Sequence, residues 1–132
     1  MVVGVGVDLV LIPRIRRAME RWQERFLRRV FTADELRYAF RRRDPAEHLA
    51  ARFAAKEATL KALGTGLSMG VRWREMEVRR PGGGRPTLSL SGRTAALGAA
   101  RGIQRFHVPL THDGDYAMAQ VVAEGDARSA DP

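Results

Sequence analysis

The sequence predicts a single α+β domain in which helices pack against a mainly antiparallel sheet. Helical periodicity dominates residues 13 to 63, and an apolar alternation of period two dominates much of the remainder. The expected order is strand, three helices, two strands, helix and hairpin, which differs from the regular alternation that builds a parallel sheet. With 132 residues, the chain has the length of one domain. We expect this domain to span residues 1–124, followed by a polar, flexible tail at 125–132.

The composition limits the classes of protein and of site. No stretch approaches the roughly 18 apolar residues of a membrane span, and no basic region precedes the N-terminal apolar run. We therefore expect a cytoplasmic protein that binds no membrane. Cysteine is absent, which excludes disulfides, thiolate metal sites and a cysteine nucleophile. The net charge of +8 predicts an anionic partner: nucleic acid, phosphates or an acidic protein.

An apolar run at residues 2–8 predicts a buried strand that ends at Asp8. Pro13 then predicts the start of a helix over residues 13–30. Apolar residues recur there at helical spacing, and five arginines recur about 140° away around the axis. One face should pack while the other presents guanidinium groups. The apolar positions are Ile15, Met19, Trp22, Phe26 and Val30, and the arginines are Arg14, Arg17, Arg21, Arg25 and Arg28.

Local signals place the remaining elements. A capping box from Thr32 to Glu35 predicts a helix towards Phe40, and Asp44-Pro45 with Gly64 predicts another over residues 45–63. Residues 92–101 are rich in alanine and should be helical, and the turn 112–115 should join the last two strands into a hairpin. The alternating apolar residues that predict strands are Val71 and Trp73; Met76 and Val78; Leu88 and Leu90; Phe106, Val108 and Leu110; and Ala117, Ala119 and Val121.

The helix over residues 45–63 carries a charged anomaly. Lys56 projects into a buried stripe of Leu49, Phe53, Leu60 and Leu63, so its ammonium group must reach solvent or an anion. Glu57 and Lys61 lie four residues apart on the flank of this stripe. Two interpretations remain open: a helix salt bridge beside a lysine that extends to solvent, or a carboxylate and two ammonium groups that converge on a magnesium-bound phosphate.

Other polar residues are weaker candidates. Asp8 offers a second carboxylate, although an aspartate that closes a strand is also typical of a turn. Gly4 and Gly6 do not form a dinucleotide-binding loop, because Leu9 occupies the position of the third glycine. At the expected hairpin turn, Thr111, His112 and Asp113 offer a hydroxyl, an imidazole and a carboxylate together, and structural and functional roles are equally open there.

These motifs together resemble the family of holo-acyl-carrier-protein synthases, the small phosphopantetheinyl transferases. The likeness covers residues 2 to about 123. One departure is Pro109, which stands where the family usually has a serine. The matching segments are Gly4-Val5-Gly6-Val7-Asp8 with Arg14, Phe31-Thr32 with Glu35, Arg52 to Ala58, Lys61 to Gly66, Trp73, Glu77-Val78, Gly84-Arg85-Pro86, and Thr111-His112.

The resemblance implies transfer of 4′-phosphopantetheine from coenzyme A to a serine of an acyl carrier protein, in fatty acid or polyketide biosynthesis. Asp8 and Glu57 would bind Mg²⁺, and Lys61 would neutralise the pyrophosphate. Glu57 would take the serine proton, directly or through a metal-bound water, with His112 and Asp113 as the competing choice. The implied coenzyme A contacts are Asp8, Arg52, Glu57, Lys61, Gly64, Pro86, Thr111 and His112.

The resemblance further implies a homotrimer whose sites lie between subunits. Carrier proteins are acidic around the modified serine, so the arginine stripe acquires a partner, and Arg14, Arg17 and Arg21 are the expected docking residues. Two other classes of function are weighed against the enzyme. A basic nucleic-acid-binding domain would explain the charge, but the aromatic residues fall at core spacings, and we expect no nucleic acid. A non-catalytic structural subunit would leave Lys56 and Asp8 unexplained.

Overall fold

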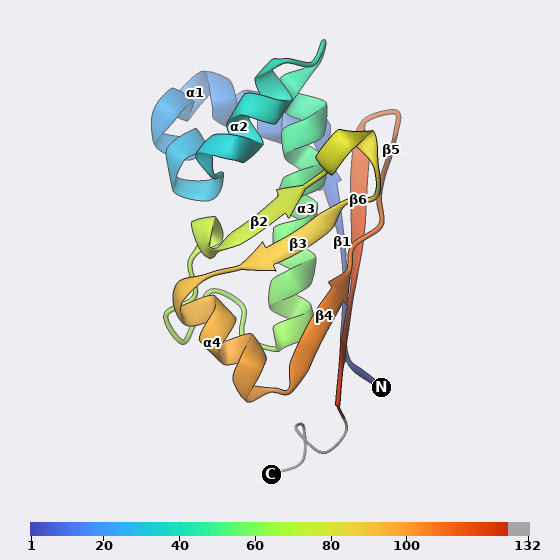
Figure 1. Ribbon diagram of the computed structural model, residues 1–132. Coiled ribbons are helices and arrows are strands. Elements are labelled where there is room, and N and C mark those ends of the chain that lie inside the picture. Colours follow the sequence, from blue (N-terminus) through green and yellow to red (C-terminus); the bar gives the residue numbers. More distant parts are fainter. Residues whose placement is uncertain (127–132) are drawn as a thin grey trace.

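The computed structural model describes residues 1–126 and arranges them as four α-helices and two antiparallel sheets (Figure 1). This arrangement confirms the predicted α+β class. Gly125 belongs to the last strand, which therefore extends one residue into the range predicted as a tail, and residues 127–132 lie outside the described part. The elements are β1 (Val2–Leu11), α1 (Ile12–Val30), α2 (Ala33–Phe40), α3 (Pro45–Leu63), the 3₁₀ helix η1 (Trp73–Glu75), β2 (Met76–Arg79), the 3₁₀ helix η2 (Pro81–Gly83), β3 (Thr87–Leu90), α4 (Gly92–Ala100), β4 (Ile103–His107), β5 (Leu110–Asp113) and β6 (Tyr116–Gly125).

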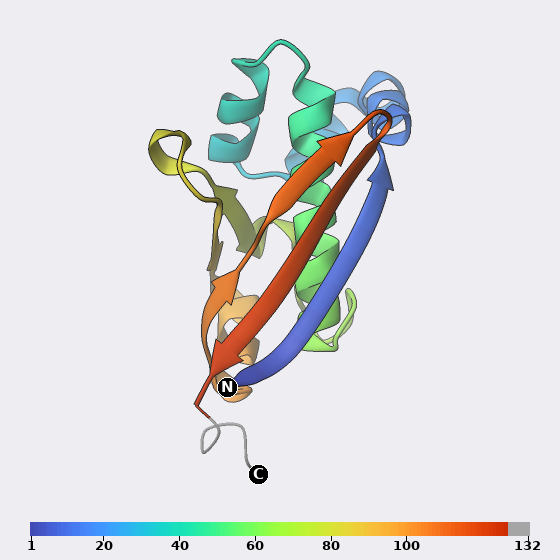
Figure 2. The same ribbon diagram turned by 90° about the vertical axis from the view of Figure 1, so that its right-hand side faces the viewer.

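The last strand, β6, is the centre of the larger sheet. It pairs with β1 on one side and with β4 and β5 on the other, always antiparallel, while β2 and β3 form a separate hairpin. Helix α3 runs along one face of the larger sheet (Figure 2). The core lies between them, where small side chains such as Ala58 of α3 and Ala119 of β6 are fully buried.

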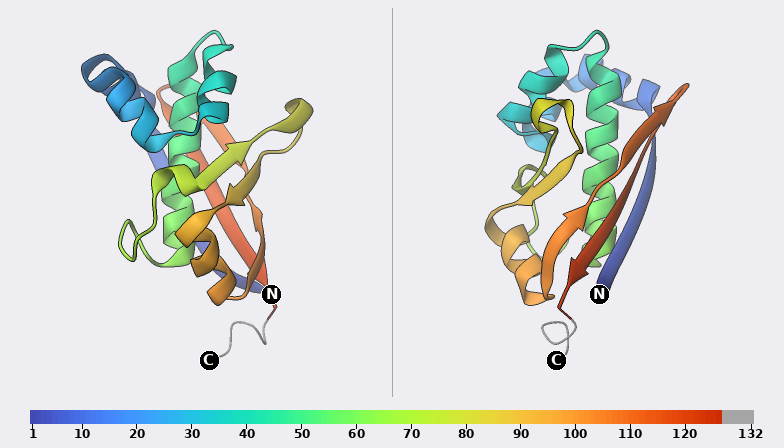
Figure 3. Two further views of the ribbon diagram at one scale, coloured as in Figure 1. Left: turned by 60° about the vertical axis from the view of Figure 1, so that its left-hand side comes forward. Right: turned by 45° about the vertical axis from the view of Figure 1, so that its right-hand side comes forward.

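The first strand is longer and less buried than predicted. It continues to Leu11, so Asp8 lies within the strand and not at its end. Its outer side chains Val5 and Val7 are about half exposed, because only one face of this sheet is covered by helices (Figure 3). The sequence pattern was misleading here because nearly every residue of the run is apolar, whichever face it occupies.

Two strand predictions in the second half are wrong. Val71 and Trp73 do not belong to a strand, and Trp73 instead opens η1. The segment from Phe106 to Leu110 is divided into β4 and β5 at Pro109, which has no N–H group for a ladder. The hairpin turn is also shorter than predicted, since Asp113 still belongs to β5 and only residues 114 and 115 form the turn.

Helix α1 follows the predicted range but is interrupted. Gln23 has φ 48° and ψ −129°, outside the helical region, so the apolar stripe loses its phase there. Trp22 is 48% exposed, which contradicts its assignment to the packed face, while Ile15 and Val30 are buried. The start of α1 is held by a hydrogen bond from the Ile12 N–H group to the Asp115 carbonyl oxygen, 2.7 Å, in the β5–β6 turn.

Two glycines allow β1 to contact the backbone of α3 directly. A Cβ atom on Gly4 would lie 2.2 Å from the Ala62 carbonyl oxygen, and one on Gly6 would lie 1.8 Å from that of Ala58. Both distances are far shorter than a van der Waals contact, so neither position accepts a side chain in this packing. Gly4, Gly6 and Asp8 alternate along one face of the strand, and Asp8 therefore faces α3.

Within residues 1–126, none of the helices has the length and apolar character that crossing a membrane requires.

We expect Gly6→Ala to lower the free energy of unfolding by about 1–3 kcal/mol or more, because β1 must move away from α3. Gly98→Ala is the matched control, since the nearest atom to its added Cβ is the flexible Leu90 Cδ1 at 3.3 Å. This control should be neutral or stabilising by up to about 1 kcal/mol. Chemical denaturation measures both variants, and equal stability of Gly6→Ala and wild type would contradict the close approach.

Candidate active site

Lys56 follows neither of the two interpretations that its sequence position left open. Its side chain is fully buried, and its Nζ atom donates to Glu35 Oε1 at 2.6 Å, to the Val30 carbonyl oxygen at 2.7 Å and to the Trp73 carbonyl oxygen at 3.2 Å. Desolvation lowers the pKa of Lys56, and the charge of Glu35 opposes that shift. The lysine is therefore a buried structural cation and does not extend towards solvent or a phosphate.

Glu35 balances this cation and performs two other tasks. Its Oε1 atom accepts from the Thr32 N–H group at 2.9 Å, which completes the predicted capping box of α2. Its Oε2 atom accepts from the Val78 N–H group of β2 at 2.8 Å. The capping motif in the sequence predicts the local role of Glu35 but not its pairing with Lys56, although a lysine in a buried stripe requires an anion.

Two carboxylates and one ammonium group meet where β1 crosses α3. Lys61 Nζ donates to Asp8 Oδ1 at 3.0 Å and to the Val7 carbonyl oxygen at 2.9 Å. Burial raises the pKa of Glu57, and the negative charge of Asp8 raises it further against the opposing charges of Lys61 and Arg14. The structure thus brings together Asp8, Glu57 and Lys61, as predicted, and adds Arg14 at the start of α1.

A second cluster surrounds Arg52, which is buried although it is an arginine. Its guanidinium group lies 4.2 Å from the centre of the Tyr38 ring, and Arg42 lies 4.0 Å from the same centre. The Arg52 Nε atom is buried and has no hydrogen-bond partner within residues 1–126. A pocket of about 230 Å³ between Tyr38, Arg52 and Arg80 opens here. An unpartnered buried donor among several cations favours an anionic ligand.

The neighbouring arginines change the pKa of the Tyr38 phenol. Burial alone would raise its pKa, but the hydrogen bond and charge of Arg42, together with the charge of Arg52, lower it overall. The sequence did not identify Tyr38, Arg42 or Arg80 as site residues, because no local motif contains them. Only the packing of α2 and the β2–β3 hairpin around Arg52 brings them together.

The three polar residues of β5 do not point the same way. His112 pairs in register with the buried Ala117, and its Nε2 atom lies 3.1 Å from Glu47 Oε1 of α3. Thr111 and Asp113 alternate with it and occupy the opposite, exposed face of the sheet. His112 and Asp113 are therefore not joined into a catalytic pair within this chain.

The remaining candidates lie at ends of elements. Gly64 caps α3 in the left-handed conformation with φ 75°, and its N–H group donates to the carbonyl oxygens of Leu60 and Lys61. Pro86 precedes β3 and is partly buried. Arg14, Arg17 and Arg21 line an open groove of about 550 Å³ on the first half of α1, together with Trp22.

The two clusters lie on different sides of α3. Arg52 and Glu57 are five residues apart, which corresponds to about 140° around a helix, and Lys61 lies about 180° from Arg52. Along the chain, Asp8 faces the Glu57 side, whereas His112 contacts Glu47 near the start of α3. A single chain therefore does not turn Arg52 towards the predicted metal residues Asp8 and Glu57, and it holds His112 at Glu47, ten residues before Glu57.

Known proteins resemble this chain over most of its length. The model of the 4′-phosphopantetheinyl transferase superfamily matches residues 4–121. The chain belongs to this superfamily. A holo-[acyl-carrier-protein] synthase of Syntrophotalea carbinolica is 50% identical to it over 123 residues, which cover 93% of this chain and 96% of the relative.

Solved structures of the superfamily share the fold. The crystal structure of holo-[acyl-carrier-protein] synthase from Neisseria meningitidis superposes with a TM-score of 0.86 at 33% identity, covering 94% of this chain and 99% of that chain. The enzyme of Helicobacter pylori, solved in complex with coenzyme A, gives a TM-score of 0.79 at 27% identity, covering 91% of this chain and 99% of that chain. The chain is thus similar to members of this 4′-phosphopantetheinyl transferase superfamily along nearly its whole length.

The residues at the β1–α3 crossing fit a hard divalent cation. Asp8 and Glu57 supply carboxylate oxygens; burial, and after it the negative charge of Asp8, raises the pKa of Glu57, and a bound cation would offset that cost of ionisation. Within residues 1–126, no three side chains of the His, Cys, Asp and Glu types gather closely enough to hold a metal ion alone. Substrate oxygens or water would have to complete the coordination, which is how Mg²⁺ usually binds with phosphates.

We expect Glu35→Ala to lower the free energy of unfolding by about 3–5 kcal/mol, because Lys56 would remain buried without a counterion. The double variant Glu35→Ala/Lys56→Met should recover part of this loss, since it removes the orphaned charge. Glu24→Ala, at an exposed glutamate of α1, is the control and should change stability by less than about 0.5 kcal/mol. Urea denaturation of the three variants tests this ion pair. If Glu35→Ala were as stable as the control variant, the stabilising role of the pair would be refuted.

Proposed function

We propose that this chain transfers 4′-phosphopantetheine from coenzyme A to a serine of apo-acyl-carrier protein and releases adenosine 3′,5′-bisphosphate. The observation that carries the proposal is the cluster of Asp8, Glu57 and Lys61 at the β1–α3 crossing, within the superfamily fold. The names of the relatives supply the acceptor, and the coenzyme A complex of the Helicobacter pylori enzyme supplies the donor. Mass measurement of a candidate carrier after incubation with coenzyme A and Mg²⁺ tests the proposal directly.

The reaction is a phosphoryl transfer in which the carrier serine oxygen bonds to the phosphorus that bears pantetheine. The bond from that phosphorus to the oxygen shared with the adenosine 5′-phosphate breaks, and the nucleotide leaves with that oxygen. Mg²⁺, held by Asp8 and Glu57, would neutralise the charge of the diphosphate. Lys61 lies on the same side of α3 and would stabilise the negative charge on the leaving phosphate.

Glu57 is our choice for the group that accepts the serine proton. Its place beside Asp8 and Lys61 at the β1–α3 crossing supports this choice, because the serine would meet the diphosphate there. The competing choice was His112 with Asp113, and the opposite orientations of these two residues on β5 favour Glu57.

The coenzyme A phosphates would bind around Arg52. Its unpartnered buried Nε atom and the neighbouring guanidinium group of Arg42 support this assignment, whereas the coenzyme role of His112 rests on the resemblance. Asp8, Glu57 and Lys61 would contact the diphosphate. Gly64, Pro86 and Thr111 stay predicted coenzyme contacts that rest on the resemblance alone.

A homotrimer with sites between subunits would reunite the two clusters. Two observations support it: the clusters occupy different sides of α3, and the face of the sheet opposite α3 exposes an apolar surface that another subunit could cover. The exposed apolar residues of this face are Val5, Val7, Leu9, Leu11, Tyr116 and Met118.

The groove on the first half of α1 would dock the acidic carrier protein. Arg14, Arg17 and Arg21 line it, and Arg14 is close enough to Glu57 to lower its pKa. This neighbourhood would bring the carrier serine towards the phosphate. A role in fatty acid or polyketide biosynthesis and a cytoplasmic location remain predictions.

We expect Glu57→Gln to reduce transfer to no more than a few per cent of wild type. Because folding raises the pKa of Glu57, its ionised carboxylate is unfavourable in the metal-free protein, and the amide should leave that protein as stable or more stable near pH 7. Carrier mass measurement and denaturation in EDTA measure the two effects. Glu24→Gln is the control for both measurements. Substantial residual transfer by Glu57→Gln would show that the Glu57 carboxylate is not required for the reaction.

We expect complementation when inactive Asp8→Ala and inactive His112→Ala proteins are mixed. If each site takes Asp8 from one subunit and His112 from its neighbour, exchange creates some sites with both residues intact. Activity should appear only after subunit exchange, which native mass spectrometry can follow. Verified mixed oligomers without activity would indicate a site within one chain.

A further inference from the structure

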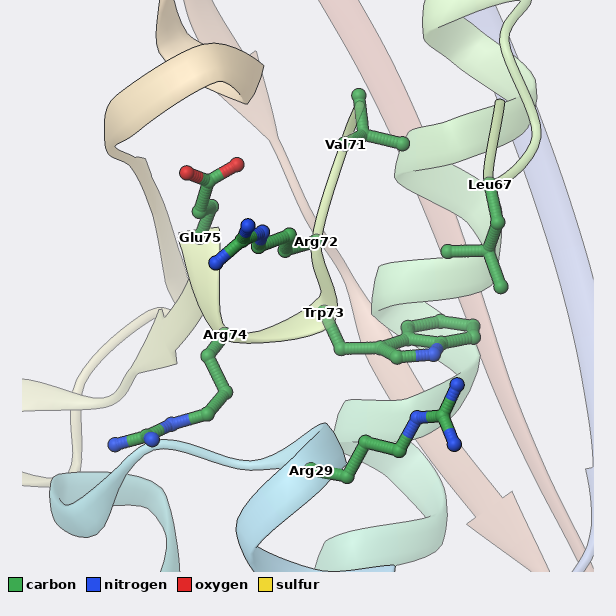
Figure 4. Close-up of a pocket in the computed structure, with 7 residues that line it drawn as sticks. All are labelled: Arg29, Leu67, Val71, Arg72, Trp73, Arg74 and Glu75. Atoms are coloured by element: carbon green, nitrogen blue, oxygen red, sulfur yellow. The ribbon is translucent and has the colours of Figure 1, made fainter. Parts of the chain in front are cut away.

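A groove beside η1 gathers positive charge that the proposed reaction does not use. It has a volume of about 450 Å³ and lies between the end of α1 and the loop that follows α3 (Figure 4). The residues that line it are Arg29, Leu67, Val71, Arg72, Trp73, Arg74 and Glu75. We call this the η1 groove.

The η1 groove is lined by three arginines and one acid, Glu75, on which the charge of Arg72 acts. Within residues 1–126, no ion pair joins Arg29, Arg72 or Arg74 to a carboxylate. Glu75 is the one acid in the lining, but its carboxylate accepts the Thr94 hydroxyl at 2.8 Å and backbone N–H groups at the start of α4. These hydrogen bonds are the main cause that lowers its pKa. The groove therefore carries a surplus of positive charge.

The η1 groove also has an apolar part. Leu67 is 52% exposed, and the Trp73 ring packs on Phe53 of α3 with ring centres 5.2 Å apart. An exposed leucine beside an indole anchored on the core offers a site for an apolar side chain. Such a combination, with arginine around an aromatic residue, is typical of protein interfaces.

The directions of the arginines distinguish a protein surface from a small anion. Arg72 points towards Glu75, Arg74 extends away from the Trp73 ring, and Arg29 lies on the other side of the groove (Figure 4). A phosphate site would require the guanidinium groups to converge on one point. Their spread instead matches several acidic groups distributed over an extended surface.

The η1 groove lies beside the other end of the helix that carries the proposed docking groove. Arg29 lies in the last turn of that helix, and Arg14, Arg17 and Arg21 lie in its first half, separated by the interruption at Gln23. We infer that the η1 groove is a second docking contact for the acidic carrier protein, in which Arg72 and Arg74 pair with carrier carboxylates and an apolar carrier side chain contacts Leu67 and Trp73. This inference rests on the proposed transfer to a carrier.

Steady-state kinetics with apo-carrier and coenzyme A test this inference. The double variant Arg72→Glu/Arg74→Glu should raise the apparent KM for the carrier about tenfold or more at low salt, because like charges now meet at the interface. The KM for coenzyme A and the kcat at saturating carrier should stay unchanged. The difference in carrier KM between the double variant and wild type should become smaller near 1 M salt, where the screening length is about 3 Å. Arg41→Glu, at an exposed arginine after α2, is the control for charge reversal and should leave the carrier KM unchanged.

The two tryptophans allow a direct binding measurement. Trp22 lies in the α1 groove and Trp73 in the η1 groove, and the chain contains no other tryptophan. In Trp22→Phe, the fluorescence of Trp73 should therefore change when apo-carrier is added without coenzyme A. The same titration after Arg72→Glu/Arg74→Glu should require a higher carrier concentration.

Several results would overturn the inference. An unchanged carrier KM in the double variant, while Arg14→Glu raises it, would confine docking to the α1 groove. A raised KM for coenzyme A with an unchanged carrier KM would assign the η1 groove to the donor. Wild-type protein that modifies no carrier would instead contradict the proposed function, so the two failures are distinguishable.

Discussion

The buried ion pair between Lys56 and Glu35 is the interaction on which the arrangement of the helices depends. Four separate segments send a group to it: the end of α1 through Val30, α2 through Glu35, η1 through Trp73 and β2 through Val78. Burying two charges is costly, and full hydrogen bonding on both sides is what makes it tolerable. Because α3 cannot rotate without breaking these bonds, the pair also fixes the direction of Glu57, the next residue.

Small residues of α3 allow close packing against β1, and charged residues of the same helix form the two clusters of the site. The alanines of α3 and the glycines of β1 bring two backbones so close that Asp8 reaches Lys61 at 3.0 Å. On another side of the same helix, Arg52 remains buried beside Tyr38 with an unused donor. One helix thus presents an anionic cluster and a cationic cluster in different directions, which suits a substrate that carries both metal-binding and arginine-binding phosphates.

Sequence patterns predicted those parts of the fold that local chemistry determines. The helices α2 and α3 follow from their capping signals, and the pairing of β5 with β6 follows from the turn at Gly114. The length of β1 was missed because a run of apolar residues does not indicate which side chains are covered. The interruption at Gln23 has no local signal such as proline or glycine, so the helical wheel assigned Trp22 to the packed face.

The site was less predictable because its contacts join distant parts of the chain. Asp8 and Lys61 are separated by 53 positions and Lys56 and Glu35 by 21, so no spacing rule could pair them. The resemblance to a known family identified Asp8, Glu57 and Lys61 together. It did not identify the environment of Arg52 or the arginines of the η1 groove, which belong to no shared motif. Lys56 was recognised as anomalous, but its partner required the folded structure.

The hydrogen bond from Ile12 to Asp115 makes the start of α1 and the β5–β6 turn one rigid corner. Arg14 follows Ile12 by two residues, and His112 precedes Asp115 by three. In the proposed trimer these two side chains would serve different active sites, so each corner would link one site to the next. A carrier on α1 would then stand at a set spacing from the coenzyme at the neighbouring site, and consecutive sites could not change their geometry independently.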